Sequence, residues 1–134
     1  NDWCYGPYLK QEMDACVATY GATQADLFDL LYLNPARNFQ MKCFRACAFN
    51  ACRGFNLDGS FAEHVPYTLA FSVSRINAER GIAVREAAKY CIKALRSISF
   101  GHLRRGSNVC EDSDYLLQCL GMNTPPGTNF VGAF

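Results

Sequence analysis

The eight cysteines are the side chains whose type and number most clearly indicate chemistry in this 134-residue chain. An even count at this density is typical of a disulfide framework formed in an oxidising compartment. Zinc is the alternative use of many cysteines, but a zinc site needs several closely spaced Cys or His pairs. Cys47 and Cys52 form one such pair, and no second pair completes it because His64 and His102 lie far apart. The sequence therefore predicts disulfides, no metal site and no cofactor.

The other reactive side chains form no catalytic motif, so we predict that the protein is not an enzyme. The chain lacks a Gly-x-Ser-x-Gly turn, a phosphate-binding loop and a His-Glu-x-x-His helix. We interpret Glu111, Asp112 and Asp114 as the solvated first turns of a helix, where carboxylates favour the positive end of the helix dipole. His64 and His102 are candidates for pH switches that loosen a pocket in acid. A binding curve that is identical at pH 5 and pH 7.5 would end that idea.

Helices must position these side chains, because apolar residues recur at steps of three and four and no segment alternates like a strand. We expect about six of them. They cover residues 8–20, a short segment after Thr23, about 36–53 with Asn34-Pro35 at its start, a segment near Pro66, a segment after Gly81, and a segment from Ser107 or Asn108 to Leu120. Gly21 and Gly121 are interpreted as helix ends, Gly81 as the break between two helices, and Gly54 as a C-cap. Residues 99–107 are expected to form a loop, and Asn56-Leu57-Asp58-Gly59 a turn.

Composition is that of an ordinary globular protein. Half of the residues are hydrophobic, 19% are charged and the net charge is +1, so whole-molecule charge indicates no partner. No run approaches the roughly 18 apolar residues of a membrane span. The chain starts at Asn1 and has no signal-like apolar segment, which fits a mature secreted chain. We predict a single helical domain over residues 1–134 that is secreted and extracellular.

The order and spacing of six cysteines resembles one known family. Cys16 is followed by Cys43-x3-Cys47, then by Cys91 and then by Cys110-x8-Cys119. In a helical secreted chain this pattern, with the turn at residues 56–59, resembles the insect odorant-binding (pheromone-binding) proteins over roughly residues 8–120. The resemblance implies an all-α fold of about six helices stapled by disulfides around an internal apolar cavity.

The pairing of the cysteines also follows from the resemblance only, since eight cysteines allow 105 connectivities. It implies the bridges Cys16–Cys47, Cys43–Cys110 and Cys91–Cys119, and leaves Cys4 and Cys52 for a fourth. The 18 residues between Cys91 and Cys110 exceed the gap usual in the family, and the extra pair is not part of its six-cysteine set. Both departures indicate a divergent member, or a relative recruited for another task.

An apolar surplus favours a ligand cavity among the helices. Ten Phe, seven Tyr and three Met exceed what six short helices need merely to close, and ligand pockets are mostly apolar. The candidate lining residues in the helices are Met13, Leu69, Val73, Ile76, Leu95 and Leu116. The alternative for each of them is an ordinary core position.

The C-terminal tail is the second candidate wall of that cavity. No charged side chain occurs from Tyr115 to Phe134. We therefore predict that the tail, residues 122–134, docks on the body through Phe130, Val131 and Phe134 as a pocket wall or lid. The resemblance supports this, since some family members use the segment in that way; the alternative is a loose tail.

Charge is unevenly placed and leaves two functions open. Residues 1–35 hold five acidic side chains against Lys10, a net charge of −4, whereas residues 87–110 hold five basic and no acidic side chains, a net charge of +5. The first function is extracellular transport of a small hydrophobic odorant, pheromone or lipid-like molecule by a monomer or weak dimer that contacts a chemoreceptor. The alternative is a secreted salivary or venom-type scavenger whose basic surface binds polyanions or host factors. Nucleic acid is not expected as a partner.

Overall fold

The computed structural model describes the backbone of residues 6–101 and 108–133, and the side chains of these residues except 98–101. Within these residues the chain forms six α-helices and a single isolated β-bridge, between Phe55 and Phe61. The helices are α1 (Gly6–Tyr20), α2 (Gln24–Leu31), α3 (Phe39–Ala51), α4 (Val65–Ser74), α5 (Ala78–Gly101) and α6 (Val109–Met122). The predicted fold class, all-α with about six helices, is confirmed.

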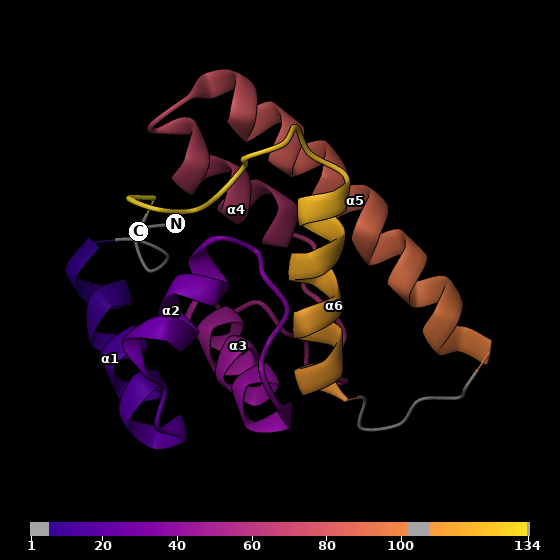
Figure 1. Cartoon of the computed structure of the whole chain (residues 1–134). Coiled ribbons are helices and arrows are strands. Elements are labelled where there is room, and N and C mark those ends of the chain that lie inside the picture. The colour runs from indigo at the N-terminus through magenta and orange to yellow at the C-terminus, as the bar shows by residue number, and fades with distance from the viewer. Residues whose placement is uncertain (1–5, 102–107, 134) are drawn as a thin grey trace.

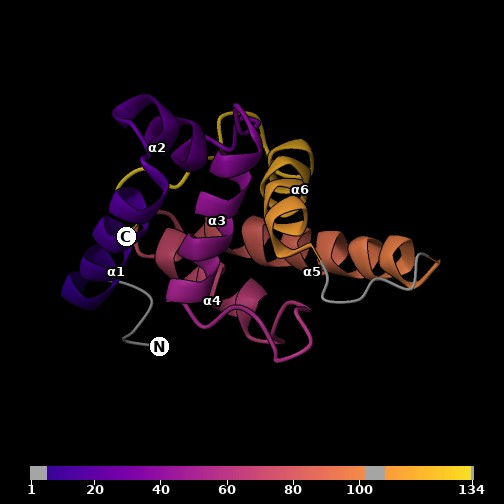
Figure 2. The same ribbon diagram turned by 90° about the horizontal axis from the view of Figure 1, so that it is seen from below.

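Helix α3 lies at the centre of the arrangement, with α1 on one side and α6 on the other (Figure 1). Helix α4 lies above α3 in that view, and α5 packs against both α4 and α6. Seen from below, the same pairs remain adjacent (Figure 2). The buried side chains of all six helices join in one apolar core, to which the C-terminal segment adds Phe130 and Ala133.

Side-chain caps set the starts of three helices. Thr23 and Asp26 form a capping box at α2, Asn38 accepts the N–H of Met41 at α3, and Asn108 accepts the N–H of Glu111 at α6. The prediction that Asn34-Pro35 starts the third helix is therefore wrong, because the first capped turn begins only at Phe39.

Two glycines that were interpreted as a helix break and a helix end lie inside helices. Gly81 is in the first turns of α5, and the break between α4 and α5 comes earlier, where the Asn77 side chain accepts the N–H of Arg80. A Cβ atom on Gly81 would lie 2.6 Å from the Cβ of Ser74, so glycine permits the close crossing of α4 and α5. Gly121 lies in the last turn of α6. Helix α5 also continues through Gly101, into the segment expected to be a loop; residues 102–107 lie outside the described part.

Three disulfides staple these helices and confirm the pairing that the resemblance implied. Cys16–Cys47 joins α1 to α3, Cys43–Cys110 joins α3 to α6, and Cys91–Cys119 joins α5 to α6. Each contributes on the order of 2–4 kcal/mol by restricting the unfolded chain. Cys52 is also disulfide-bonded, and its predicted partner Cys4 lies outside the described residues.

Candidate ligand cavity

An apolar cavity lies between helices α1, α2, α3, α4 and α6 and the C-terminal segment. Its volume is about 50 Å³, whereas a water molecule needs about 10–15 Å³ by the same measure. The cavity is therefore narrow but larger than a single-water site. Its described lining residues are Leu9, Met13, Leu30, Ala48, Phe49, Cys52, Gly54, Val65, Thr68, Leu69, Leu117 and Phe130.

Helical spacing explains how several of these side chains reach one space. Leu9 and Met13 are one turn apart on α1, and Val65 and Leu69 are one turn apart on α4, so each pair projects from one face of its helix. The chain leaves α3 at Cys52 and returns past the cavity at Gly54. A Cβ atom on Gly54 would lie 2.9 Å from the carbonyl oxygen of Phe49, so glycine lets this turn close the wall.

Thr68 is the lining residue with a hydroxyl group, and that group is already engaged. Its Oγ1 donates to the carbonyl oxygen of His64 at 2.7 Å and lies 2.9 Å from the Nδ1 of the same histidine. The His64 Nε2 lies 2.9 Å from the carbonyl oxygen of Arg53, in the turn that closes the cavity. His64 thus connects two parts of the cavity wall, and its role as a pH switch stays a prediction. His102 lies outside the described residues.

The C-terminal segment supplies one side of the cavity through Phe130. After α6 this segment crosses the molecule past α4 toward α1 and α2 (Figure 1). The Phe130 side chain is only 2% exposed, and its N–H donates to the carbonyl oxygen of Leu31 at 2.8 Å. Arg75, directly after α4, donates from Nη1 to the carbonyl oxygen of Ala133 at 3.0 Å. The segment is therefore held at both α2 and α4.

The fold of this chain, rather than its sequence, is similar to that of a known protein. No protein-family model and no curated protein matches the chain. The structure is similar to that of the odorant-binding protein dmelOBP28a from Drosophila melanogaster, with a TM-score of 0.58 and 18% sequence identity over 86% of this chain and 88% of that one. The fold is that of an odorant-binding protein. The likeness is one of fold, and the three disulfides are typical of proteins from an oxidising compartment. None of the helices in the described residues has the length and apolar character needed to cross a membrane.

Within this odorant-binding-protein fold, the predicted ligand-binding residues separate into four groups. Met13, Leu69 and Phe130 line the cavity. Val73, Leu95 and Leu116 are buried but are not among the lining residues, so they occupy the core positions that were the alternative. Phe134 lies outside the described residues.

Two predicted placements are wrong. Ile76 is 56% exposed because α4 ends at Ser74, so the helical spacing that would turn this side chain inward is not continued. Val131 is 44% exposed because the tight turn from Phe130 to Ala133 buries those two side chains and directs Val131 outward.

Sequence reasoning missed most of the wall. Leu9 and Val65 lie one turn before Met13 and Leu69, so extending each helical stripe by one turn would have found them. No sequence signal singles out Ala48, Cys52 or Gly54, because their place in the wall depends on how α3 ends.

The interpretation of the acidic group at the start of α6 as a solvated helix end is wrong. Asp112 and Asp114 are buried, and only Glu111 is exposed. Asp114 Oδ1 accepts from Arg45 Nη1 at 2.9 Å and from the backbone N–H of Ala36 at 3.0 Å. Burial lowers the pKa of the Arg45 guanidinium. This buried pair joins α3 to α6, which explains the acid there better than solvation does.

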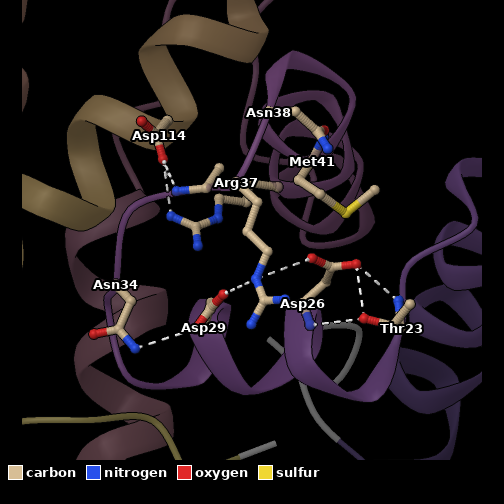
Figure 3. Close-up of polar contacts among 10 residues, drawn as sticks. Thr23, Asp26, Asp29, Asn34, Arg37, Asn38, Met41 and Asp114 are labelled. Carbon is tan, nitrogen blue, oxygen red and sulfur yellow. Dashed lines mark hydrogen bonds and ion pairs between the residues drawn. The ribbon is translucent and has the colours of Figure 1, made fainter.

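A second polar cluster lies beside that pair, at α2 and the α2–α3 connection (Figure 3). Arg37 Nε donates to Asp29 at 2.8 Å and lies 3.8 Å from Asp26. The hydrogen bond from Arg37 lowers the pKa of the Asp29 carboxyl, and a bond from Asn34 adds to this effect. These contacts hold the irregular connection against α2.

A basic groove lies between α4 and α5 of the odorant-binding-protein fold. Lys89, Lys93 and Arg96 line it, together with Tyr67 and Glu63. The three basic side chains are exposed and recur at steps of four and three along α5, so they share one face of the helix. The segment 102–107, which holds the other basic residues of the 87–110 region, lies outside the described residues.

Proposed function

We propose that this protein is an extracellular carrier that binds a small apolar molecule in the cavity bounded by α1, α2, α3, α4, α6 and Phe130. The observation that supports the proposal is the composition of the wall: every described lining side chain is apolar, except for the engaged hydroxyl of Thr68. An apolar ligand that leaves water for such a wall gains about 25 cal/mol for each Å² of buried surface. A dissociation constant near 1 µM corresponds to about 8 kcal/mol, which is the strength we expect.

The C-terminal segment is proposed to act as a removable wall of the cavity. It is attached by the Phe130–Leu31 and Arg75–Ala133 hydrogen bonds and by the buried Phe130 ring. Deletion of residues 129–134 should open the cavity and weaken ligand binding. An unchanged affinity in a folded deletion variant would contradict this role.

The use that we propose is transport of an odorant, pheromone or lipid-like molecule in an extracellular fluid, by a secreted monomer or weak dimer that delivers it to a chemoreceptor. The support is the likeness to a Drosophila protein that is named for odorant binding, together with the disulfides.

The experiment that tests the carrier function is native mass spectrometry of the purified protein, with uptake of a fluorescent naphthylamine probe as a second readout. A co-purified apolar molecule that is released on denaturation, or saturable uptake of the probe, is the expected result. A protein that is empty and also takes up no probe would overturn the proposal.

A matched pair of variants tests whether the probe occupies this cavity. Ala48→Leu adds three carbons to the wall on α3 and should weaken probe binding at least tenfold by filling the space. Ala18→Leu makes the same change on the exposed face of α1 and should leave binding within twofold. Equal effects of the two changes would place the probe elsewhere.

The basic groove supports a second candidate function, binding of a polyanion such as a sulfated polysaccharide. Lys93 and Arg96 are exposed along one side of the groove, and Lys89 lies 5.2 Å from the centre of the Tyr67 ring. Glu86, 3.9 Å from Lys89, reduces the local positive charge but does not cancel it.

Heparin is a suitable probe of that groove. Binding should weaken steeply between low and physiological salt, because exposed charges are screened, and it should be lost in the variant Lys89→Ala/Lys93→Ala/Arg96→Ala. Cavity binding of an uncharged probe should respond to neither change. Heparin binding that survives the triple substitution would contradict this second function.

A further inference from the structure

The side-chain hydroxyl on the described cavity wall already donates its hydrogen within the protein. The Thr68 hydroxyl carries one hydrogen, which it donates to the carbonyl oxygen of His64, and its oxygen faces the His64 ring at 2.9 Å. The hydrogen of this hydroxyl is therefore not available to a ligand, and the second lone pair of its oxygen is the acceptor site that it leaves. The Met13 thioether and the Cys52 sulfur are weak acceptors and offer little in its place.

The backbone groups of Gly54 and Phe130, two wall residues outside the helices, also form hydrogen bonds within the protein. The N–H of Gly54 donates to Phe49 at 2.9 Å, and its carbonyl oxygen accepts from Ala62 at 2.7 Å. The N–H of Phe130 donates to Leu31 at 2.8 Å, and its carbonyl oxygen accepts from Ala133 at 3.0 Å. At Gly54 and Phe130 the chain therefore directs its backbone polar groups into the protein rather than into the cavity.

One buried side-chain oxygen in the described residues does lack a partner, and it lies outside the lining. It is the Oγ of Ser113 on α6, a residue with no exposed surface. The α6 residue that does line the cavity is Leu117. Ser113 therefore adds no hydrogen-bonding group to the described wall.

We infer that the enclosed part of the ligand is a compact hydrocarbon, and that the cavity discriminates against hydroxylated and carboxylated analogues of the same skeleton. This inference rests on the carrier function proposed above and specifies its ligand class. A hydroxyl that enters the cavity gives up its hydrogen bonds to water and can recover only the one that the spare lone pair of Thr68 accepts, whereas a carboxylate finds no free side-chain donor in the described wall. An apolar pocket rejects an analogue that adds one hydroxyl by up to about a hundredfold, which sets the size of the expected preference. The small volume restricts the hydrocarbon to compact molecules.

The test uses three terpenoids with one carbon skeleton: limonene, perillyl alcohol and perillic acid. Each is used to displace the fluorescent probe from the wild-type protein at neutral pH. Limonene should bind at least tenfold more tightly than the alcohol and at least a hundredfold more tightly than the acid. An alcohol or acid that binds as tightly as limonene, or more tightly, would overturn the inference.

Hydrocarbons also leave water more readily than alcohols do, and this alone would favour limonene. A matched pair of variants distinguishes the contribution of the cavity wall to the affinity ratio from this solvation effect. Met13→Gln places an amide on the cavity wall at nearly constant length, and should reduce the ratio of limonene to alcohol affinity at least fivefold. Met122→Gln makes the same change at an exposed position and should leave the ratio unchanged. A ratio that is equal in both variants would mean that the wall does not select, and would overturn the inference.

The outcomes also distinguish this inference from the carrier function. If the protein binds neither the probe nor any of the three terpenoids, the carrier function fails. If it takes up the probe and prefers the alcohol or the acid, the carrier function stands and the hydrocarbon preference fails.

Discussion

Arg45 of α3 and Asp114 of α6 form an ion pair of 2.9 Å in the interior, with 2% and 7% of their side chains exposed. Asp114 also accepts the N–H of Ala36 and the side-chain amide of Gln118, so one carboxylate orders three segments. Removal of one partner from a buried pair leaves an uncompensated charge, which typically costs about 3–5 kcal/mol.

We therefore predict that Asp114→Ala lowers the free energy of unfolding by about 3–5 kcal/mol. The measurement is urea unfolding followed by circular dichroism, with the disulfides intact. The control is Glu111→Ala on the same helix, which removes the more exposed pair with Lys42 and should cost less than about 1 kcal/mol. Similar losses in the two variants would show that the Asp114 carboxylate has no special part in joining α3 to α6.

The pH dependence of stability should include a contribution from Asp29. Arg37 lowers the pKa of this carboxyl below its ordinary value of 3.8. A carboxyl with a lowered pKa in the folded state stabilises the fold above the unfolded pKa, and this contribution is lost as the pH falls through the folded value. The wild-type protein should therefore lose more stability between pH 5 and pH 2.5 than Asp29→Asn does. Parallel losses in the two proteins, measured by urea unfolding, would remove Asp29 from the explanation.

Substitution of two helical glycines by alanine should have opposite effects. Gly81→Ala should destabilise the protein by about 1–3 kcal/mol, because its Cβ would clash with Ser74 at 2.6 Å and with the carbonyl oxygen of Ala70 at 3.0 Å. Gly121→Ala should be neutral or should stabilise by up to about 1 kcal/mol, because alanine favours helices and the nearest atom, in Leu33, is 3.5 Å away. Thermal unfolding gives the sign of each change. Stabilisation by Gly81→Ala would mean that α4 and α5 can move apart freely.

The neighbouring residues Phe130 and Val131 test the tail without shortening it. Phe130→Ala should lower the free energy of unfolding by up to about 3–5 kcal/mol. The loss is smaller if the tail detaches while the rest of the protein stays folded. It should also weaken probe binding at least tenfold. Val131→Ala, at an exposed position one residue along the chain, should change neither quantity measurably. A Phe130→Ala variant with wild-type probe affinity would show that the ring does not enclose the ligand.

Those parts of the fold that depend on local or periodic signals were predictable from the sequence. Apolar spacing of three and four indicated the helices, and Thr23 and Pro66 marked two helix starts correctly. The cysteine spacings, through the family that they resemble, indicated three disulfide pairs that the structure contains. The spacing without the resemblance left 105 pairings open, because a sequence does not show which helices lie within bridging distance of one another.

Other features were decided only by packing between distant segments. Gly81 has the sequence signature of a helix break, but α5 passes through it because its missing side chain admits α4. Asp114 has the signature of a solvated helix start, but Arg45, which is 69 positions away in the sequence, makes it a core residue. Neither partner can be read from local sequence, because each contact exists only after the helices have met.

The candidate cavity divides in the same way. The sequence by itself indicated helical stripes that contain Met13 and Leu69, and an uncharged tail that contains Phe130. The tertiary structure decided that Ile76 and Val131 face outward, since one lies beyond the end of α4 and the other lies in a tight turn. It also decided that the hydroxyl of Thr68 is engaged by His64. A sequence shows which side chains are apolar, whereas the space between them and the partners of their polar groups depend on where separate segments come to rest.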